Sequence, residues 1–190
     1  MPNYCENVLE VTGKPEDLKS FKEFIKGDKR GLGEGAVLDF NKIIPYPKKF
    51  KDLDKKAKYR EASRAQEIKR LGYKELRDIP DDQREKIWKA FPDIKDGYNS
   101  GGHDWCCANW GTKWNSCDPS LQETEKNLKY KFETAWSPPL PVIHMMGVMF
   151  PKLKFHIMYN ESGMQFRGSM KVIKGEVKDY KQESYGEEDE

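Results

Sequence analysis

The sequence lacks any apolar run near the roughly 18 to 20 residues that a membrane-spanning helix needs. Its start, "MPNYCENVLEV", has neither the basic end nor the apolar stretch of a secretory signal peptide. A net charge of +2 over 190 residues gives no overall electrostatic attraction to nucleic acid or to membranes. These absences predict a cytoplasmic protein without membrane contact, in which any charge-based function depends on a local patch.

Cysteine and histidine are both scarce, with four residues of the first kind and three of the second. The chain has no C-x₂-C pair, the spacing common in zinc and iron–sulfur sites. The reducing cytoplasm keeps cysteines as thiols. We therefore expect four thiols and no disulfide.

Hydrophobic periodicity divides the N-terminal part into short elements. Residues 7–13 are typical of a strand that ends at a glycine, and residues 14–27 predict a helix with a proline in its first turn. The glycine-rich residues 27–35 predict a loop. The apolar residues 36–47 predict a second strand, ended by two prolines.

The composition changes from Lys48 onward. Residues 48–76 are rich in Ala, Lys and Glu and poor in large apolar residues, which favours a solvated helix. A second helix is predicted at residues 80–91, and "WCCANWGTKWN" (105–115) predicts a helical turn broken at Gly111. We expect a mostly helical insertion at about residues 48–126.

Strand periodicity returns after this insertion. Residues 127–136 alternate aromatic with polar side chains, which predicts a strand with Tyr130, Phe132 and Trp136 under the helices and lysines facing outward. The last elements expected are a helix at 137–150 with Ser137 as its N-cap, strands at 153–160 and 164–173, and an acidic disordered tail at 177–190.

The order of these elements is strand–helix–strand, insertion, strand–helix–strand and one further strand. It is typical of the split βαβ arrangement. The sequence therefore predicts an α+β protein with a ferredoxin-like antiparallel sheet, a helical insertion and an extra C-terminal strand. We expect a single domain at residues 1–176.

Four motifs carry a family resemblance: "MPNYCENVLEVTG", "FNKIIPYP", "WGTKWN" and "FETAWSPPLPVI". In these motifs the chain resembles the YubB-type ferredoxin-like domain proteins of phages, plasmids and integrated bacterial elements. The resemblance covers the N-terminal elements and residues 110–167. It implies the ferredoxin-like fold and a mobile-element origin, and it supplies no catalytic residue.

Metal binding and thiol catalysis are hypotheses for the aromatic segment. His103, Cys106, Cys107 and Cys117 have the number and type of ligands that structural zinc needs, although adjacent cysteines rarely bind one tetrahedral ion. Thiol catalysis needs a lowered pKa and a base oriented by a third group, and nothing in the sequence brings His144 or His156 near Cys106 or Cys107. We therefore expect inert thiols, no cofactor and no catalytic residue, with zinc as the weaker alternative.

The tryptophans support a different hypothesis. Trp110 and Trp114 are four residues apart and share one face of a helical turn. Packing in the core is favoured, and a small-ligand or nucleotide pocket is the alternative. The candidate binding residues are Trp110, Thr112, Lys113, Trp114, Asn115, Glu133 and Trp136.

A basic patch in the insertion supports a nucleic-acid hypothesis, because its cations outnumber the neighbouring acids. A helix kept soluble by charge is the simpler interpretation. The patch residues are Lys48, Lys49, Lys51, Lys55, Lys56, Lys58, Arg60 and Arg64.

Taken together, the sequence favours a non-enzymatic accessory protein of a phage or another mobile element. We expect it to bind a protein of the host or of the element, with inhibition of host defence as one form of this function. Nucleic-acid binding through residues 48–70 is the first alternative. A pocket near Trp110 and Trp114 is the second.

Overall fold

A computed structural model describes residues 3–27 and 36–185 and divides the chain into two compact units. Unit 1 comprises Met1–Pro45 and Asp104–Glu190, and unit 2 comprises Tyr46–His103. The predicted glycine-rich loop falls, apart from its first glycine, outside the described residues. No helix in the described ranges combines the length and the apolar character needed to span a membrane.

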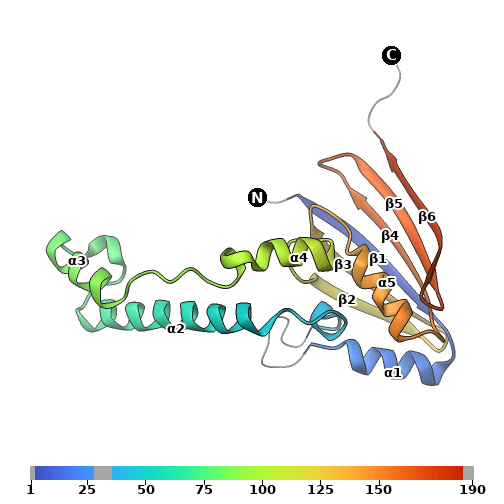
Figure 1. Cartoon of the computed structure of the whole chain (residues 1–190), viewed down its shortest axis with the longest axis horizontal. Helices are drawn as coiled ribbons and strands as arrows, with labels where there is room; N and C mark the ends of the chain where they lie inside the picture. Colours follow the sequence, from blue (N-terminus) through green and yellow to red (C-terminus); the bar gives the residue numbers. More distant parts are fainter. Residues whose placement is uncertain (1–2, 28–35, 186–190) are drawn as a thin grey trace, which may run out of the picture. The chain divides into compact units, whose positions relative to one another are not determined.

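Unit 1 contains a six-stranded sheet in the order β2-β3-β1-β4-β5-β6, in which every neighbouring pair is antiparallel (Figure 1). The strands are β1 (Tyr4–Thr12), β2 (Cys117–Thr124), β3 (Asn127–Ala135), β4 (Lys154–Glu161), β5 (Phe166–Ile173) and β6 (Glu176–Ser184). The inner order β4-β1-β3-β2 is that of the split βαβ arrangement. The predicted α+β class and ferredoxin-like topology are confirmed.

Two helices of unit 1, α1 (Pro15–Ile25) and α5 (Leu140–Met149), pack on the same face of the sheet. Phe21 of α1 is fully buried and makes edge-to-face contacts with Tyr130, Phe150 and Phe155, at centroid distances of 6.2, 5.1 and 5.4 Å. Such aromatic pairs add stability beyond their buried area. The opposite face carries charged pairs such as Lys129–Glu10, at 3.3 Å.

The prediction of a second strand at residues 36–47 is wrong. Residues 40–42 form a short 3₁₀ turn, η1 (Phe40–Lys42), in which the N–H of Asn41 donates to the carboxylate of Asp39. Three successive residues, 38–40, are buried, so the burial lacks the alternation of a strand. The second strand of the fold is β2, which lies inside the predicted insertion and ends it earlier than expected.

The prediction of a disordered tail at 177–190 is also wrong for most of its length. Residues up to Ser184 belong to β6, which pairs with β5 and forms one edge of the sheet. Val177 and Tyr180 are its large apolar residues, and the charged residues between them hid the strand pattern. Residues 186–190 lie outside the described residues.

The turn between β3 and α5 also differs from expectation. Ser137 does not cap the helix, because its hydroxyl donates to the carbonyl of Gly111 and α5 begins only at Leu140. Trp136 has a φ of +69°, which ends the strand alternation. Its side chain is consequently 38% exposed, whereas Tyr130 and Phe132 are buried as predicted.

Unit 2 is helical. It contains α2 (Lys48–Arg70), η2 (Leu76–Asp78), α3 (Asp81–Ala90) and η3 (Tyr98–Gly102), and α4 (His103–Trp110) follows it. Ile68, Ile79 and Ile87 form a small core where α3 packs against the end of α2.

The segment that follows α3 then runs back beside α2 (Figure 1). Asp54 of α2 accepts hydrogen bonds from the N–H groups of Gly97 and Tyr98, at 2.8 and 3.1 Å. A Cβ on Gly97 would lie 2.0 Å from the carbonyl oxygen of Phe50. Only glycine therefore fits this close approach of two backbones.

Candidate nucleic-acid interface

The aromatic segment belongs to the core of unit 1. Trp110 is only 3% exposed, and its indole N–H donates to the carbonyl of Ile44 at 2.8 Å. Its ring contacts Phe40 and Trp105 edge to face, at centroid distances of 6.0 and 5.5 Å. This environment supports the packing interpretation of Trp110 over the pocket.

The polar candidates near Trp110 also have structural partners. Thr112 is buried, and its hydroxyl donates to the carbonyl of Ala135 and accepts from the N–H of the same residue, both at 3.0 Å. The side-chain oxygen of Asn115 accepts from the N–H of Phe40 at 2.9 Å. The indole of Trp114 donates to the Cys117 sulfur at 3.2 Å. These contacts hold the segment against β3 and η1.

The remaining candidates are more exposed. The Lys113 ammonium lies 4.6 Å from the ring centroid of Trp136, within the range of a cation–π contact. Glu133 is partly buried in β3, opposite Glu6 of β1. The structure thus places four of the seven candidates in contacts that pack the segment, pairs Lys113 with Trp136, and leaves Glu133 on β3.

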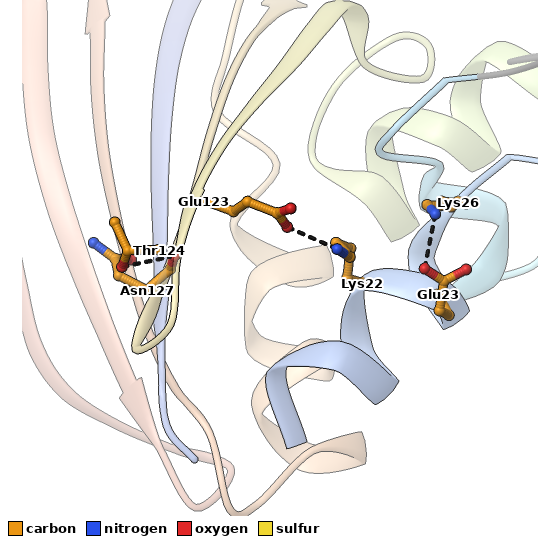
Figure 2. A network of polar contacts seen from close by, with 6 residues as sticks. All are labelled: Lys22, Glu23, Lys26, Glu123, Thr124 and Asn127. Atoms are coloured by element: carbon orange, nitrogen blue, oxygen red, sulfur yellow. Dashed lines mark hydrogen bonds and ion pairs between the residues drawn. The ribbon is translucent and has the colours of Figure 1, made fainter. Parts of the chain in front are cut away.

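Two surface depressions lie elsewhere. The smaller, of about 210 Å³, is lined by residues of α1 and of the β2–β3 hairpin, including Leu18, Lys22 and Glu123. Figure 2 shows the Lys22–Glu123 ion pair at 2.7 Å that joins these elements. Its hydrogen bond to Glu123 raises the pKa of Lys22. The depression is smaller than the roughly 300–1,000 Å³ of most ligand sites.

The larger depression, of about 410 Å³, lies between α2 and α3. Its walls include Leu71, Ile87 and Phe91, with Glu67 and Lys86 among the charged residues. Neither of these two depressions is lined by the tryptophans of the aromatic segment.

The cysteines do not form the proposed zinc site. Cys106 is buried while Cys107 is exposed, because adjacent helical residues point in different directions. Within the described part of the chain, no three His, Cys, Asp or Glu side chains are grouped to hold a metal ion. Burial raises the pKa of Cys5 to about 12 and also raises that of Cys117, which disfavours the nucleophilic thiolate in both.

The basic patch of α2 resolves into two parts. Arg60 donates to the carbonyl of Ala90, and Arg64 pairs with Asp93 at 2.7 Å while stacking on Trp88. Both arginines therefore stabilise unit 2 through contacts with other residues of the same unit. Lys49 lies 4.6 Å from the ring centroid of its neighbour Phe50.

The other lysines of the patch are exposed except Lys51, which is partly buried, and we refer to them together as the lysine face. Across the described residues none of them forms an ion pair, while Asp54 is bound to backbone N–H groups. The lysine face consists of Lys48, Lys51, Lys55, Lys56 and Lys58.

One aromatic residue lies within the lysine face and was missed in the sequence. Tyr59 is 77% exposed. It is nine residues from Phe50 and nine from Ile68, the two buried residues of α2, and nine residues are two and a half helical turns. This half-turn offset is readable from the sequence, and it places the ring on the outward side of α2.

Comparisons with known proteins support the fold. Residues 109–190 match the family model described as a ferredoxin-like domain in Api92-like protein. The whole chain is similar to the crystal structure of the protein Api92 from Yersinia pseudotuberculosis, with a TM-score of 0.53 and 13% identity, over 98% of this chain and 99% of that one. At this identity the likeness shows the fold alone. Among curated proteins no sequence matches the chain.

Proposed function

We propose that this protein is a non-enzymatic nucleic-acid-binding protein and that the lysine face of α2 is its contact surface. One observation carries the proposal: five lysines, four exposed and one partly buried, lie along one side of a single helix without acidic partners among the described residues. Residues 48–60 contain six lysines and one arginine against two aspartates. A local excess of this kind attracts phosphates although the whole chain is close to neutral.

The position of the lysines argues for a function other than solubility. The first turn of α2 contains Lys48, Lys49 and Lys51 and no acidic residue. Cations near a helix N-terminus oppose the helix dipole, at a cost of about 0.3–1 kcal/mol each. A bound phosphate would reverse this penalty, since anions are stabilised at the same end.

The sheet offers a weaker alternative surface. Its open face pairs cations with acids, as in Lys171–Asp179 at 3.6 Å and Lys129–Glu10. Such paired charges leave little excess of positive potential. The lysine face is therefore the better phosphate-binding surface.

Binding of a fluorescent oligonucleotide, followed by anisotropy, tests the proposal. Replacing Lys48, Lys51, Lys55 and Lys58 with Gln is expected to weaken binding at least about tenfold, through the lost phosphate contacts. The matched control replaces Lys14, Lys19, Lys126 and Lys154, exposed lysines of unit 1, and removes the same charge. Equal weakening in both variants, or no binding by the unmodified protein, would overturn the proposal.

A protein partner is the second candidate, favoured by exposed apolar side chains at the β6 edge of the sheet. Val148, Val177 and Tyr180 are 48%, 47% and 52% exposed. A partner segment adding a strand beside β6 would cover them. The resemblance to YubB-type proteins adds a mobile-element origin and action in a bacterial cytoplasm, including inhibition of host defence.

A photo-crosslinking residue at position 180 tests this second candidate in host cells. The expected product contains a second protein and disappears when Val148 and Val177 are replaced by Asp. A product that persists in that variant, or that contains a second copy of this chain, would contradict a heterologous partner.

A further inference from the structure

We infer that the lysine face selects single-stranded nucleic acid, with the ring of Tyr59 stacking on an unpaired base. This inference rests on the proposed function and names its substrate class. Its basis is that Tyr59, the most exposed aromatic residue described in unit 2, lies among the five lysines of the lysine face.

The geometry of α2 surrounds Tyr59 with cations. Lys55 and Lys56 precede it by four and three residues, so they are its neighbours on the helix surface. Lys58 and Lys51 extend the same side of the helix. Asp52 is the acidic residue on this side and is partly buried. Phosphates held by these ammonium groups would bring their bases over the ring.

Within residues 3–27 and 36–185, the Tyr59 side chain makes no aromatic contact and no side-chain hydrogen bond. It is 77% exposed, and the hydrogen bond that involves this residue runs from the Ser63 hydroxyl to the Tyr59 backbone carbonyl. An exposed ring that stabilises no core is available to a ligand. Stacking on an aromatic side chain is tolerant of sequence, because every base has a π face.

Base pairing decides between the two forms of nucleic acid. In a duplex the faces of the bases are stacked inside the helix, and only their edges are reachable in the grooves. A single strand presents both its phosphates and its base faces. Lysines alone would bind either form, so Tyr59 is the residue that discriminates.

A membrane surface fits the same helix less well. Interfacial helices bury a broad apolar side among the lipid headgroups. The outward side of α2 offers Ala62 and Tyr59 and otherwise polar residues. Its apolar residues Phe50 and Ile68 are buried inside unit 2.

The experiment measures the affinity of the full chain for a mixed-sequence oligonucleotide of about 12 nucleotides, within the site sizes of single-strand-binding folds, alone and annealed to its complement. We expect the single strand to bind more tightly. Tyr59→Ala should weaken single-strand binding about 5- to 100-fold and leave duplex binding within about twofold. Tyr59→Phe should retain single-strand binding, and Tyr59→Leu should lose it.

Tyr180→Ala is the matched control, because it removes an exposed ring from unit 1. Equal affinity for the two forms, or an unchanged Tyr59→Ala variant, would overturn the inference and leave the proposed function standing. Absence of binding to either oligonucleotide would overturn both. Equal binding to vesicles of anionic phospholipid, also lost in Tyr59→Ala, would assign the ring to a lipid surface and contradict the inference.

Discussion

The side-chain amide of Asn115 donates to the carboxylate of Asp39 at 2.6 Å, across 76 positions of sequence. Beside it, Ser116 donates to the carbonyl of Leu38 and Trp110 to that of Ile44. All these residues belong to unit 1, and residues 46–103 lie between them in the chain. The contacts therefore hold together the two points at which the chain leaves unit 1 and re-enters it.

Replacing Asn115 tests this junction. Asn115→Ala removes the acceptor of the Phe40 N–H and the donor to Asp39, and should lower the free energy of unfolding by about 1–3 kcal/mol. Asn115→Asp brings two carboxylates together, and two such charges cannot both ionise at low cost. Its extra destabilisation should therefore grow between about pH 3 and pH 7, where carboxyl groups lose their protons.

Urea unfolding at several pH values measures both effects on Asn115. Asn109→Ala is the control, because its amide bonds a carbonyl within its own helix, that of Trp105. A pH-independent difference between Asn115→Asp and the unmodified protein would contradict the pairing with Asp39.

Trp110 should be the most sensitive tryptophan in its segment. Trp110→Ala deletes a side chain that is 3% exposed and leaves the carbonyl of Ile44 without its donor. We expect a loss of about 3–5 kcal/mol in the free energy of unfolding. Trp136→Ala, at a site that is 38% exposed, should cost about 1 kcal/mol, near the size of its contact with Lys113. Equal losses measured by chemical denaturation would rule out the assignment of Trp110 to the core.

The four thiols should react in a defined order with a chromogenic disulfide at about pH 8. Cys107 is exposed and should react first. Cys117 should follow slowly, because partial burial raises its pKa. Cys5, with a pKa raised to about 12 by burial, and the buried Cys106 should react only after unfolding. Loss of the fast phase in Cys107→Ser checks the first assignment, and four equally fast thiols would contradict the order.

Binding through the lysine face should depend strongly on salt. Neutralising about five phosphates of a single strand predicts a slope near −3.5 in a plot of the logarithm of the association constant against that of the salt concentration. Removing four lysines should bring the slope to about −0.7. Anisotropy titrations between about 50 and 200 mM salt measure both slopes. A slope near zero for the unmodified protein would show that phosphates are not what is bound.

The central strands were predictable because they are covered by helices. β3 and β4 alternate buried with less buried side chains, and this alternation is visible as hydrophobic periodicity. β2 and β6 form the two edges of the sheet, and their side chains are mostly exposed. Charged side chains are common on edge strands, where they discourage pairing with other chains. The same charges remove the pattern from which a strand is predicted.

Residues 36–47 illustrate the opposite error. Leu38, Phe40 and Ile43 are apolar because they fill the core, yet they do so from a turn that Asp39 and Asn115 stabilise. Their tertiary partners lie far away in the sequence, so local propensity could not reveal the turn. The exposed position of Tyr59 could be predicted from helical phase alone. The contacts of Arg60 and Arg64 could not, because their partners lie in α3 and in the segment after it.

The central position of β1 has a consequence for biosynthesis. Among the strands of this sheet β1 comes first in the chain, yet both of its neighbours, β3 and β4, follow more than 100 residues later. Leu9, for example, pairs with Tyr130 and Ile157. Its ladder must therefore wait until β3 and β4 have been made, and such distant pairing is slow to form. A nascent chain stopped before β3 would leave an apolar strand without either neighbour, open to capture by chaperones or to aggregation.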